Sequence, residues 1–251
     1  MREPCWRGPG ETNWGLPPYG PRQRAAETWS AVRDVAGAVT LPIGSRLTRS
    51  RIARQSFDGI ALGSGRKPPD GWIGLDRYRK GPRVYRCDLR DRLPVRSGTA
   101  PAVLAEHVLE HLFLDELPPV LLEVKRVLRP GGSFRVVSPD ARYIASLILD
   151  GDSPEYAEAI HRDAQMHRWN RQPDPLTNLI NRLSHQWGQH RALLTPRSVA
   201  SLLEQAGFVE ITQLDSVEST EHFDRIPDVH PIAFPDDPEG MNFAVEARRP
   251  E

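Results

Sequence analysis

The sequence has few cysteines, only Cys5 and Cys87 in 251 residues. Two cysteines cannot form the dense disulfide framework of a small secreted protein, and they do not have the spacing of a Cys-based metal site. No apolar run approaches the ~20 residues that a membrane-spanning helix needs, and residues 1–4 are not followed by a signal-type apolar segment. We therefore expect a cytoplasmic protein that has no contact with a membrane.

The sequence also lacks an excess of either charge, because Lys and Arg number 33 and Asp and Glu number 33. A neutral chain has no global field that would attract nucleic acid, so a small-molecule substrate is favoured. Residues 1–56 hold nine arginines against four acidic residues, which leaves a local basic surface open. The sequence is also compatible with a homodimer.

The chain divides into four segments that differ in composition and in their expected secondary structure. Residues 1–56 begin with a Pro- and Gly-rich arm and continue into a helix over 22–39. Residues 57–139 alternate strands and helices, residues 140–194 are a helical insertion rich in His, Arg and Asn, and residues 195–251 complete the core. We expect strands at 57–62, 72–76, 83–87, 101–105 and 133–137, helices at 115–129 and 196–206, and a closing pair of strands at 208–214 and 241–247. Such alternation predicts an α/β fold whose mainly parallel sheet binds ligands at the carboxyl ends of its strands.

The first of these strands leads into a glycine turn, Gly63-Ser64-Gly65. Glycines permit positive φ angles and a close approach of the backbone to a ligand. Asp76 ends the second strand, where a carboxylate can accept both hydroxyls of a ribose, and Asp88 follows the third strand, where it can accept from an adenine amino group. Asp76 comes only 11 residues after Gly65, which disfavours an NAD site.

Five motifs in order resemble those of class I S-adenosylmethionine (SAM) dependent methyltransferases. Within that superfamily the chain most resembles a predicted bacterial group with a GSG…GWxxxD…HVLEHL…RVLxPGG…PD pattern. The resemblance covers roughly residues 57–214 and 241–249. It implies a Rossmann-like sheet with an antiparallel last strand, and SAM as the cofactor. The motifs are Gly63–Gly65, Gly71–Asp76, Cys87–Leu89, Glu106–Leu112 and Arg126–Gly132.

The resemblance also implies a role for each matching residue. Gly63, Ser64 and Gly65 would contact the methionine portion of SAM, and Asp76 would hold the ribose. Asp88 and Leu89 would flank the adenine, while Glu106 and His107 would line the pocket beside the sulfonium.

Two features depart from the family pattern. Ala61 stands where an acidic residue usually precedes the glycines, so one contact to the ammonium group of the cofactor would be missing. Only nine residues (63–71) connect the first two strands, fewer than a parallel crossover with a helix needs. We expect no full helix there, and the helix over 22–39 could cover that face of the sheet instead.

The string His107-Val108-Leu109-Glu110-His111 also spells H-x-x-E-H, a motif of zinc proteases. On an α-helix, His107 and His111 would share one face. However, His107 follows a strand directly, inside a longer string that is typical of methyltransferases. We therefore expect no metal.

The insertion at 140–194 follows the fifth strand, so we expect it to be a cap that decides the substrate. A general base would assist methylation of a hydroxyl, and His107, His185 and His190 are the candidates. We expect His185 or His190 to supply it, and His107 if neither does. Asp140, Tyr143 and Trp187 are candidate substrate-binding residues.

Two other functions fit the same cofactor-binding motifs. One is another SAM-using transfer, such as aminocarboxypropyl transfer, in which a different carbon of SAM is attacked. The other is a SAM-binding regulator or partner subunit without catalytic activity.

Overall fold

The structure is a computed structural model that describes residues 48–65, 68–77, 81–166, 174–214, 220, 223 and 240–251. All of these residues belong to one compact unit, Ser45–Glu251. The predicted arm and the predicted helix over 22–39 lie outside the described residues.

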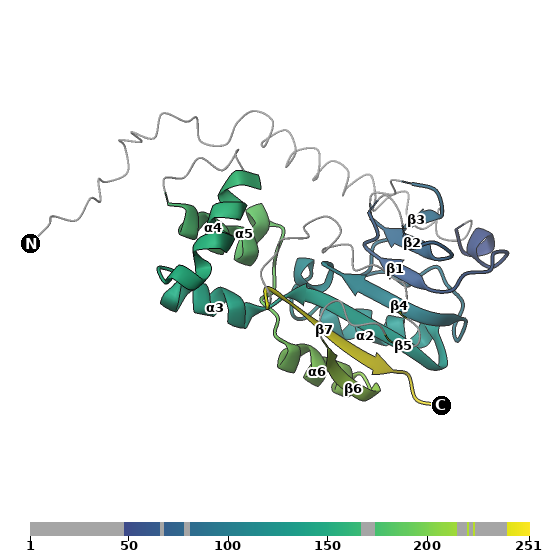
Figure 1. Cartoon of the computed structure of the whole chain (residues 1–251). Helices are drawn as coiled ribbons and strands as arrows, with labels where there is room; N and C mark the ends of the chain where they lie inside the picture. The colour runs from purple at the N-terminus through teal and green to yellow at the C-terminus, as the bar shows by residue number, and fades with distance from the viewer. Residues whose placement is uncertain are drawn as a thin grey trace, which may run out of the picture. The chain divides into compact units, whose positions relative to one another are not determined.

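A seven-stranded sheet forms the centre of this unit (Figure 1). Its strand order is β3-β2-β1-β4-β5-β7-β6; the first five are parallel, and β7 runs antiparallel to both β5 and β6. This confirms the predicted Rossmann-like, mainly parallel sheet with an antiparallel last strand. The strands are β1 (Ile60–Leu62), β2 (Ile73–Asp76), β3 (Val84–Arg86), β4 (Ala100–Glu106), β5 (Leu128–Pro139), β6 (Val209–Leu214) and β7 (Asn242–Arg248).

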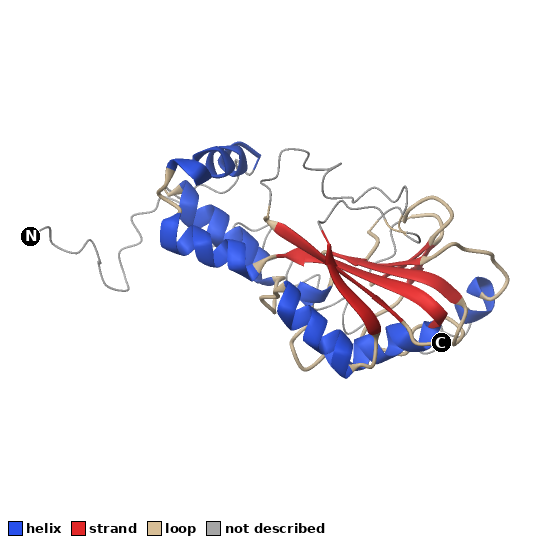
Figure 2. Ribbon diagram, turned by 60° about the horizontal axis from the view of Figure 1, so that its bottom comes forward, coloured by secondary structure: helices blue, strands red, loops and turns tan. Residues whose placement is uncertain are grey.

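Helices α2 (Leu117–Val127) and α6 (Pro196–Gln205) lie along one face of the sheet (Figure 2). Their apolar residues join the main hydrophobic core with the strands. The start of α6 follows the prediction, because Thr195 accepts a hydrogen bond from the backbone of Ser198 and Pro196 occupies the first turn. Gly207, with a φ of 76°, follows the helix end.

A smaller apolar cluster contains Trp72 and Phe223, whose ring centroids are 5.9 Å apart. Ala61, Ala102 and Leu104 of strands β1 and β4 complete it. Gly59 makes room for the indole, because a Cβ atom there would lie 2.5 Å from Trp72. The packing of Trp72, which precedes β2, therefore explains why a glycine stands at position 59, before β1.

The connection between β1 and β2 is as short as the sequence predicts. Ile60 pairs with Ile73 in parallel register, and the described residues between the two strands form turns and loop rather than a helix. As a result, Gly63 at the end of β1 is exposed.

Three helices follow β5: α3 (Ala141–Asp150), α4 (Pro154–Met166) and α5 (Pro175–His185). They lie together beyond the end of the sheet where β5 finishes (Figure 1), and they share a separate hydrophobic cluster that includes Ile144, Leu147 and Leu179. An isolated parallel bridge joins Asp140 to Leu194. The helical insertion therefore leaves the core and returns to it at the same place.

Several predicted boundaries were wrong, most of all those of the strand expected at 133–137, which runs as β5 from Leu128 to Pro139. The helix expected to run to residue 129 ends at Val127, and Leu128 already pairs with Ala100. Arg129 precedes a proline, which disfavours the helical conformation, and the Arg249 guanidinium donates hydrogen bonds to the carbonyls of Arg126 and Leu128. Strand β1 begins at Ile60 rather than at residue 57.

Among the described residues, no helix is long and apolar enough to cross a membrane.

Candidate active site

The glycine turn and Asp76 meet at the carboxyl ends of β1 and β2. Gly63 and Gly65 have φ angles of 58° and 61°, which the lack of a side chain makes accessible. The backbone N–H of Gly63 donates to the carbonyl of Leu75 (2.8 Å), and that of Gly65 donates to Oδ2 of Asp76 (3.0 Å). The Asp76 carboxylate thus holds the turn that the sequence places beside it.

The neighbours of the turn explain why small residues are needed there. A Cβ atom on Gly63 would lie 2.3 Å from Cγ2 of Val108, and a Cβ atom on Gly74 would lie 2.0 Å from Oγ of Ser64. A Cβ atom on Gly65 would meet nothing within 4 Å. The turn is therefore packed tightly against β2 and Val108, while open space lies at Gly65.

Asp88 lies near the turn because β3 pairs with β2, and the N–H of Cys87 donates to the carbonyl of Asp76 (3.0 Å). Its carboxylate accepts hydrogen bonds from Arg90 at 2.9 and 2.6 Å, and Arg77 lies 3.5 Å away. Burial raises the pKa of this carboxyl, but Arg90 outweighs burial and holds the pKa below its ordinary value. Asp88 is therefore an ionised acceptor already bound by Arg90. Leu89 packs, partly buried, against the main core.

Glu106 and His107 lie half-buried at the end of the neighbouring strand β4. Glu106 pairs with Val137 of β5, and the N–H of His107 donates to the carbonyl of Val137 (3.0 Å). His107 has a φ of 51°, a left-handed conformation that is uncommon for a residue with a side chain. Such strain persists only where the surroundings enforce it, and it gathers at functional sites.

Glu110, a residue outside the predicted site, lies at the centre of the polar contacts. It is only 2% exposed, its Oε1 lies 3.3 Å from Nδ1 of His107, and its Oε2 accepts a hydrogen bond from Oγ of Ser138 (3.2 Å). Burial raises the pKa of this carboxyl, but the hydrogen bond and charge of His107 bring it below its ordinary value. The only sequence signal for Glu110 was its place inside the H-x-x-E-H string.

The H-x-x-E-H string does not form the α-helix of a zinc protease. Only Leu109–His111 is helical, as a short 3-10 helix (η1), and His107 precedes it in the left-handed region. His111 instead meets His190 edge to face, with ring centroids 5.0 Å apart. Burial lowers the pKa of His190.

The other predicted residues of the insertion have different surroundings. His185 is exposed at the end of α5. Asp140 caps α3, accepting from the backbone of Arg142 (2.8 Å) and binding its guanidinium. Tyr143 packs edge to face on Tyr156, with centroids 6.0 Å apart. Trp187 lies in a short 3-10 helix, η2 (Gln186–Gly188), and its side chain is outside the described residues. Their roles in substrate binding remain predictions.

Residues 72–136 match the methyltransferase domain family. The matched segment runs from just before β2 into β5 and is about a quarter of the chain. A segment of 62 residues is 37% identical to the 23S rRNA (guanine(748)-N(1))-methyltransferase of Streptomyces fradiae. That segment covers 25% of this chain and only 19% of the relative.

Solved structures with a similar chain trace include other methyltransferases. A SAM-dependent methyltransferase from Archaeoglobus fulgidus is 17% identical, with a TM-score of 0.43 over 81% of this chain and 94% of the other. The phosphoethanolamine N-methyltransferase 2 of Haemonchus contortus, in complex with SAM, is 12% identical, with a TM-score of 0.40 over 82% of this chain and 52% of the other.

The ends of β1 and β2 offer polar groups and space that suit a ligand such as SAM. The hydroxyl of Ser64 is buried and has no hydrogen-bond partner in the described part of the chain. Open space lies where a side chain on Gly65 would stand, next to the Asp76 carboxylate. A polar ligand with hydroxyl groups matches this combination of an open cradle and hydrogen-bonding groups.

Replacing each glycine by alanine tests this packing. Both replacements place a side chain at positive φ, which costs about 1–2 kcal/mol, but only Gly63→Ala also collides with Val108. We expect Gly63→Ala to lower the free energy of unfolding by a further ~1–3 kcal/mol compared with Gly65→Ala. Urea denaturation measures both values. In a protein that also carries Val108→Ala, Gly63→Ala and Gly65→Ala should lower the free energy of unfolding by the same amount. Equal losses from the two glycine variants while Val108 is in place would contradict the packing.

Proposed function

We propose that the protein transfers the methyl group of SAM to a small-molecule acceptor. The hydrogen bond from Gly65 to the Asp76 carboxylate carries this proposal, because it joins the two parts of the predicted cofactor site at one edge of the sheet. The match of residues 72–136 to the methyltransferase domain family supports it. So does the neutral overall charge, which gives no general attraction to nucleic acid.

In this proposal the backbone of Gly63–Gly65 holds the methionine portion of SAM and Asp76 holds the ribose. Asp88 and Leu89 flank the adenine, and Glu106 and His107 lie beside the sulfonium. Bound SAM supplies an electrophilic methyl group. The protein supplies alignment of the acceptor for in-line displacement, an effect that can contribute ~7–11 kcal/mol to lowering the barrier.

His107 is the histidine best placed to take a proton from a hydroxyl acceptor. Its Nδ1 faces the buried Glu110 carboxylate at 3.3 Å, so the ring is oriented and Nε2 would receive the proton. Nε2 is buried in this structure, so the acceptor would have to displace what covers it. A carboxylate that orients an imidazole in this way also stabilises the imidazolium that forms. His190 is the second candidate, while the exposed His185 is the least constrained of the three.

We further propose that residues 140–194 bind the acceptor. The insertion begins and ends beside the carboxyl end of β5, where Asp140 bridges to Leu194. Asp140, Tyr143 and Trp187 are its candidate contacts. A cap at this edge would exclude water from the transfer.

Product analysis with SAM labelled in its methyl group tests the function. The protein should transfer the label to a compound in a panel of small metabolites and release S-adenosylhomocysteine. Release of methylthioadenosine would instead indicate aminocarboxypropyl transfer, and binding of SAM without either product would indicate a regulator. If the label appears in added ribosomal RNA and in none of the metabolites, the result would contradict a small-molecule acceptor. It would favour methylation of ribosomal RNA, the activity in the name of the Streptomyces fradiae relative.

Replacing His107 tests the proposed base once a hydroxyl acceptor is identified. A positioned base contributes about 10²–10⁴-fold, so His107→Gln should lower kcat by at least two orders of magnitude at saturating SAM and acceptor, while the Kd for SAM changes little. The matched variants His185→Gln and His190→Gln should keep more activity. A kcat for His107→Gln within a few-fold of the unchanged protein would exclude His107 as the base.

A further inference from the structure

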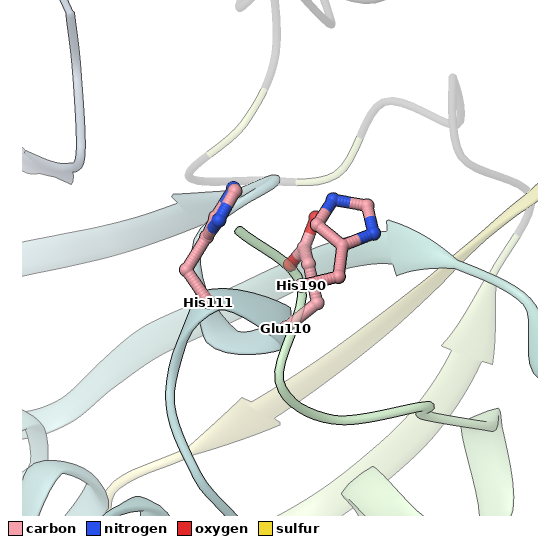
Figure 3. A group of neighbouring side chains, drawn as sticks. All are labelled: Glu110, His111 and His190. Carbon is pink, nitrogen blue, oxygen red and sulfur yellow. The ribbon is translucent and has the colours of Figure 1, made fainter. Parts of the chain in front are cut away.

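Glu110, His111 and His190 form a cluster of potential metal ligands, in which Glu110 also contacts His107. One ligand atom from each side chain lies within 4.8 Å of those of the other two, and Figure 3 shows the Glu110 carboxylate between the two imidazoles. Glu110 and His111 come from η1 after β4, whereas His190 belongs to the end of the helical insertion. The cluster therefore joins two parts of the chain that are far apart in sequence.

The hydrogen bonds of both histidines select the same tautomer. Nδ1 of His111 lies 3.1 Å from the carbonyl of Gln189, and Nδ1 of His190 lies 2.8 Å from the carbonyl of Leu183. A carbonyl oxygen can only accept, so each Nδ1 carries the proton and each neutral ring keeps a lone pair on Nε2. A backbone carbonyl on the other ring nitrogen is a common way to orient a metal-binding histidine.

The Glu110 carboxylate supplies the anionic member of the cluster. It is 2% exposed, and a buried charge needs a compensating partner. His107 and Ser138 contact its two oxygens, and ligating carboxylates in metal sites are hydrogen-bonded by outer residues in the same manner. A carboxylate oxygen has two lone pairs, so these contacts leave capacity for a cation.

We propose that Glu110, His111 and His190 bind a divalent transition-metal ion such as Zn²⁺. Two imidazoles and a carboxylate form a three-residue set that zinc uses in proteins. With tetrahedral bonds of about 2.0–2.2 Å, two ligand atoms of one ion lie ~3.3–3.6 Å apart. The ligand atoms of the cluster lie within 4.8 Å of one another, so the side chains would draw together when the ion binds.

The bound ion would fasten the end of the insertion to the end of β4. The backbone already supports this contact, because the N–H groups of Arg191 and Ala192 donate to the carbonyl of Glu110 at 2.7 and 3.1 Å. The ion binds and positions in this proposal, and it takes no part in methyl transfer. The proposal departs from the expectation, drawn from the sequence, that the protein binds no metal.

Zinc titration of the full chain, purified without a polyhistidine tag and without SAM, tests the site. Calorimetry should show about one bound Zn²⁺, and the thermal midpoint should rise when Zn²⁺ is added. We expect His111→Gln and His190→Gln each to weaken binding by at least about tenfold and to abolish the rise in thermal midpoint. Glu110→Gln should do the same where it folds.

His185→Gln is the matched control, because His185 is exposed and lies in the same segment as His190. It should bind Zn²⁺ as tightly as the unchanged protein. Circular dichroism of the metal-free variants separates loss of a ligand from loss of the fold. Failure of the unchanged protein to bind Zn²⁺, or equal affinity in His111→Gln, His190→Gln and the control, would overturn the proposal. Because no step uses SAM, either result is independent of the proposed methyl transfer.

Discussion

The account depends on the hydrogen bond between the backbone of Gly65 and the carboxylate of Asp76. The bond ties the turn after β1 to the end of β2, and the connection between these strands is too short for the helix that normally joins parallel neighbours. Glycine is favoured at positions 63, 65 and 74 for local reasons: positive φ at the first two, and the Ser64 hydroxyl against the third. The open space at Gly65, where a Cβ atom would meet nothing within 4 Å, is the proposed cofactor cradle.

A second constraint is the burial of Glu110. Its carboxylate orients His107 on one side and accepts from Ser138 on the other, while its carbonyl receives two N–H groups from residues 191 and 192. This single residue links the end of β4, the end of β5 and the return of the helical insertion. The proposed base and the proposed metal site therefore share one anchor, although their tests do not depend on each other.

The gathering of the proposed cofactor residues at one edge of the sheet could be predicted from the sequence, because parallel strands place their carboxyl ends together. The Gly63–Gly65 turn, Asp76, Asp88 and Glu106 each follow or end a strand, so strand order alone brings them to one edge. The role of Glu110 could not be predicted. His107 turns the chain through a left-handed conformation, and only a short 3-10 helix, η1, follows it. The spacing of H-x-x-E-H therefore did not indicate which side chains meet. The approach of His190 depends on three intervening helices whose packing no local pattern reveals.

Calorimetric titration of SAM tests the central claim, that the glycine turn and Asp76 form the cofactor site. Loss of a charge-assisted hydrogen bond costs about 1.5–3 kcal/mol, so Asp76→Ala should weaken SAM binding by at least tenfold. Asp76→Asn keeps an acceptor for Gly65 and should lose less. Asp91→Ala, at an exposed acidic residue after β3, should bind as the unchanged protein does. An unchanged Kd in a folded Asp76→Ala variant would contradict the account.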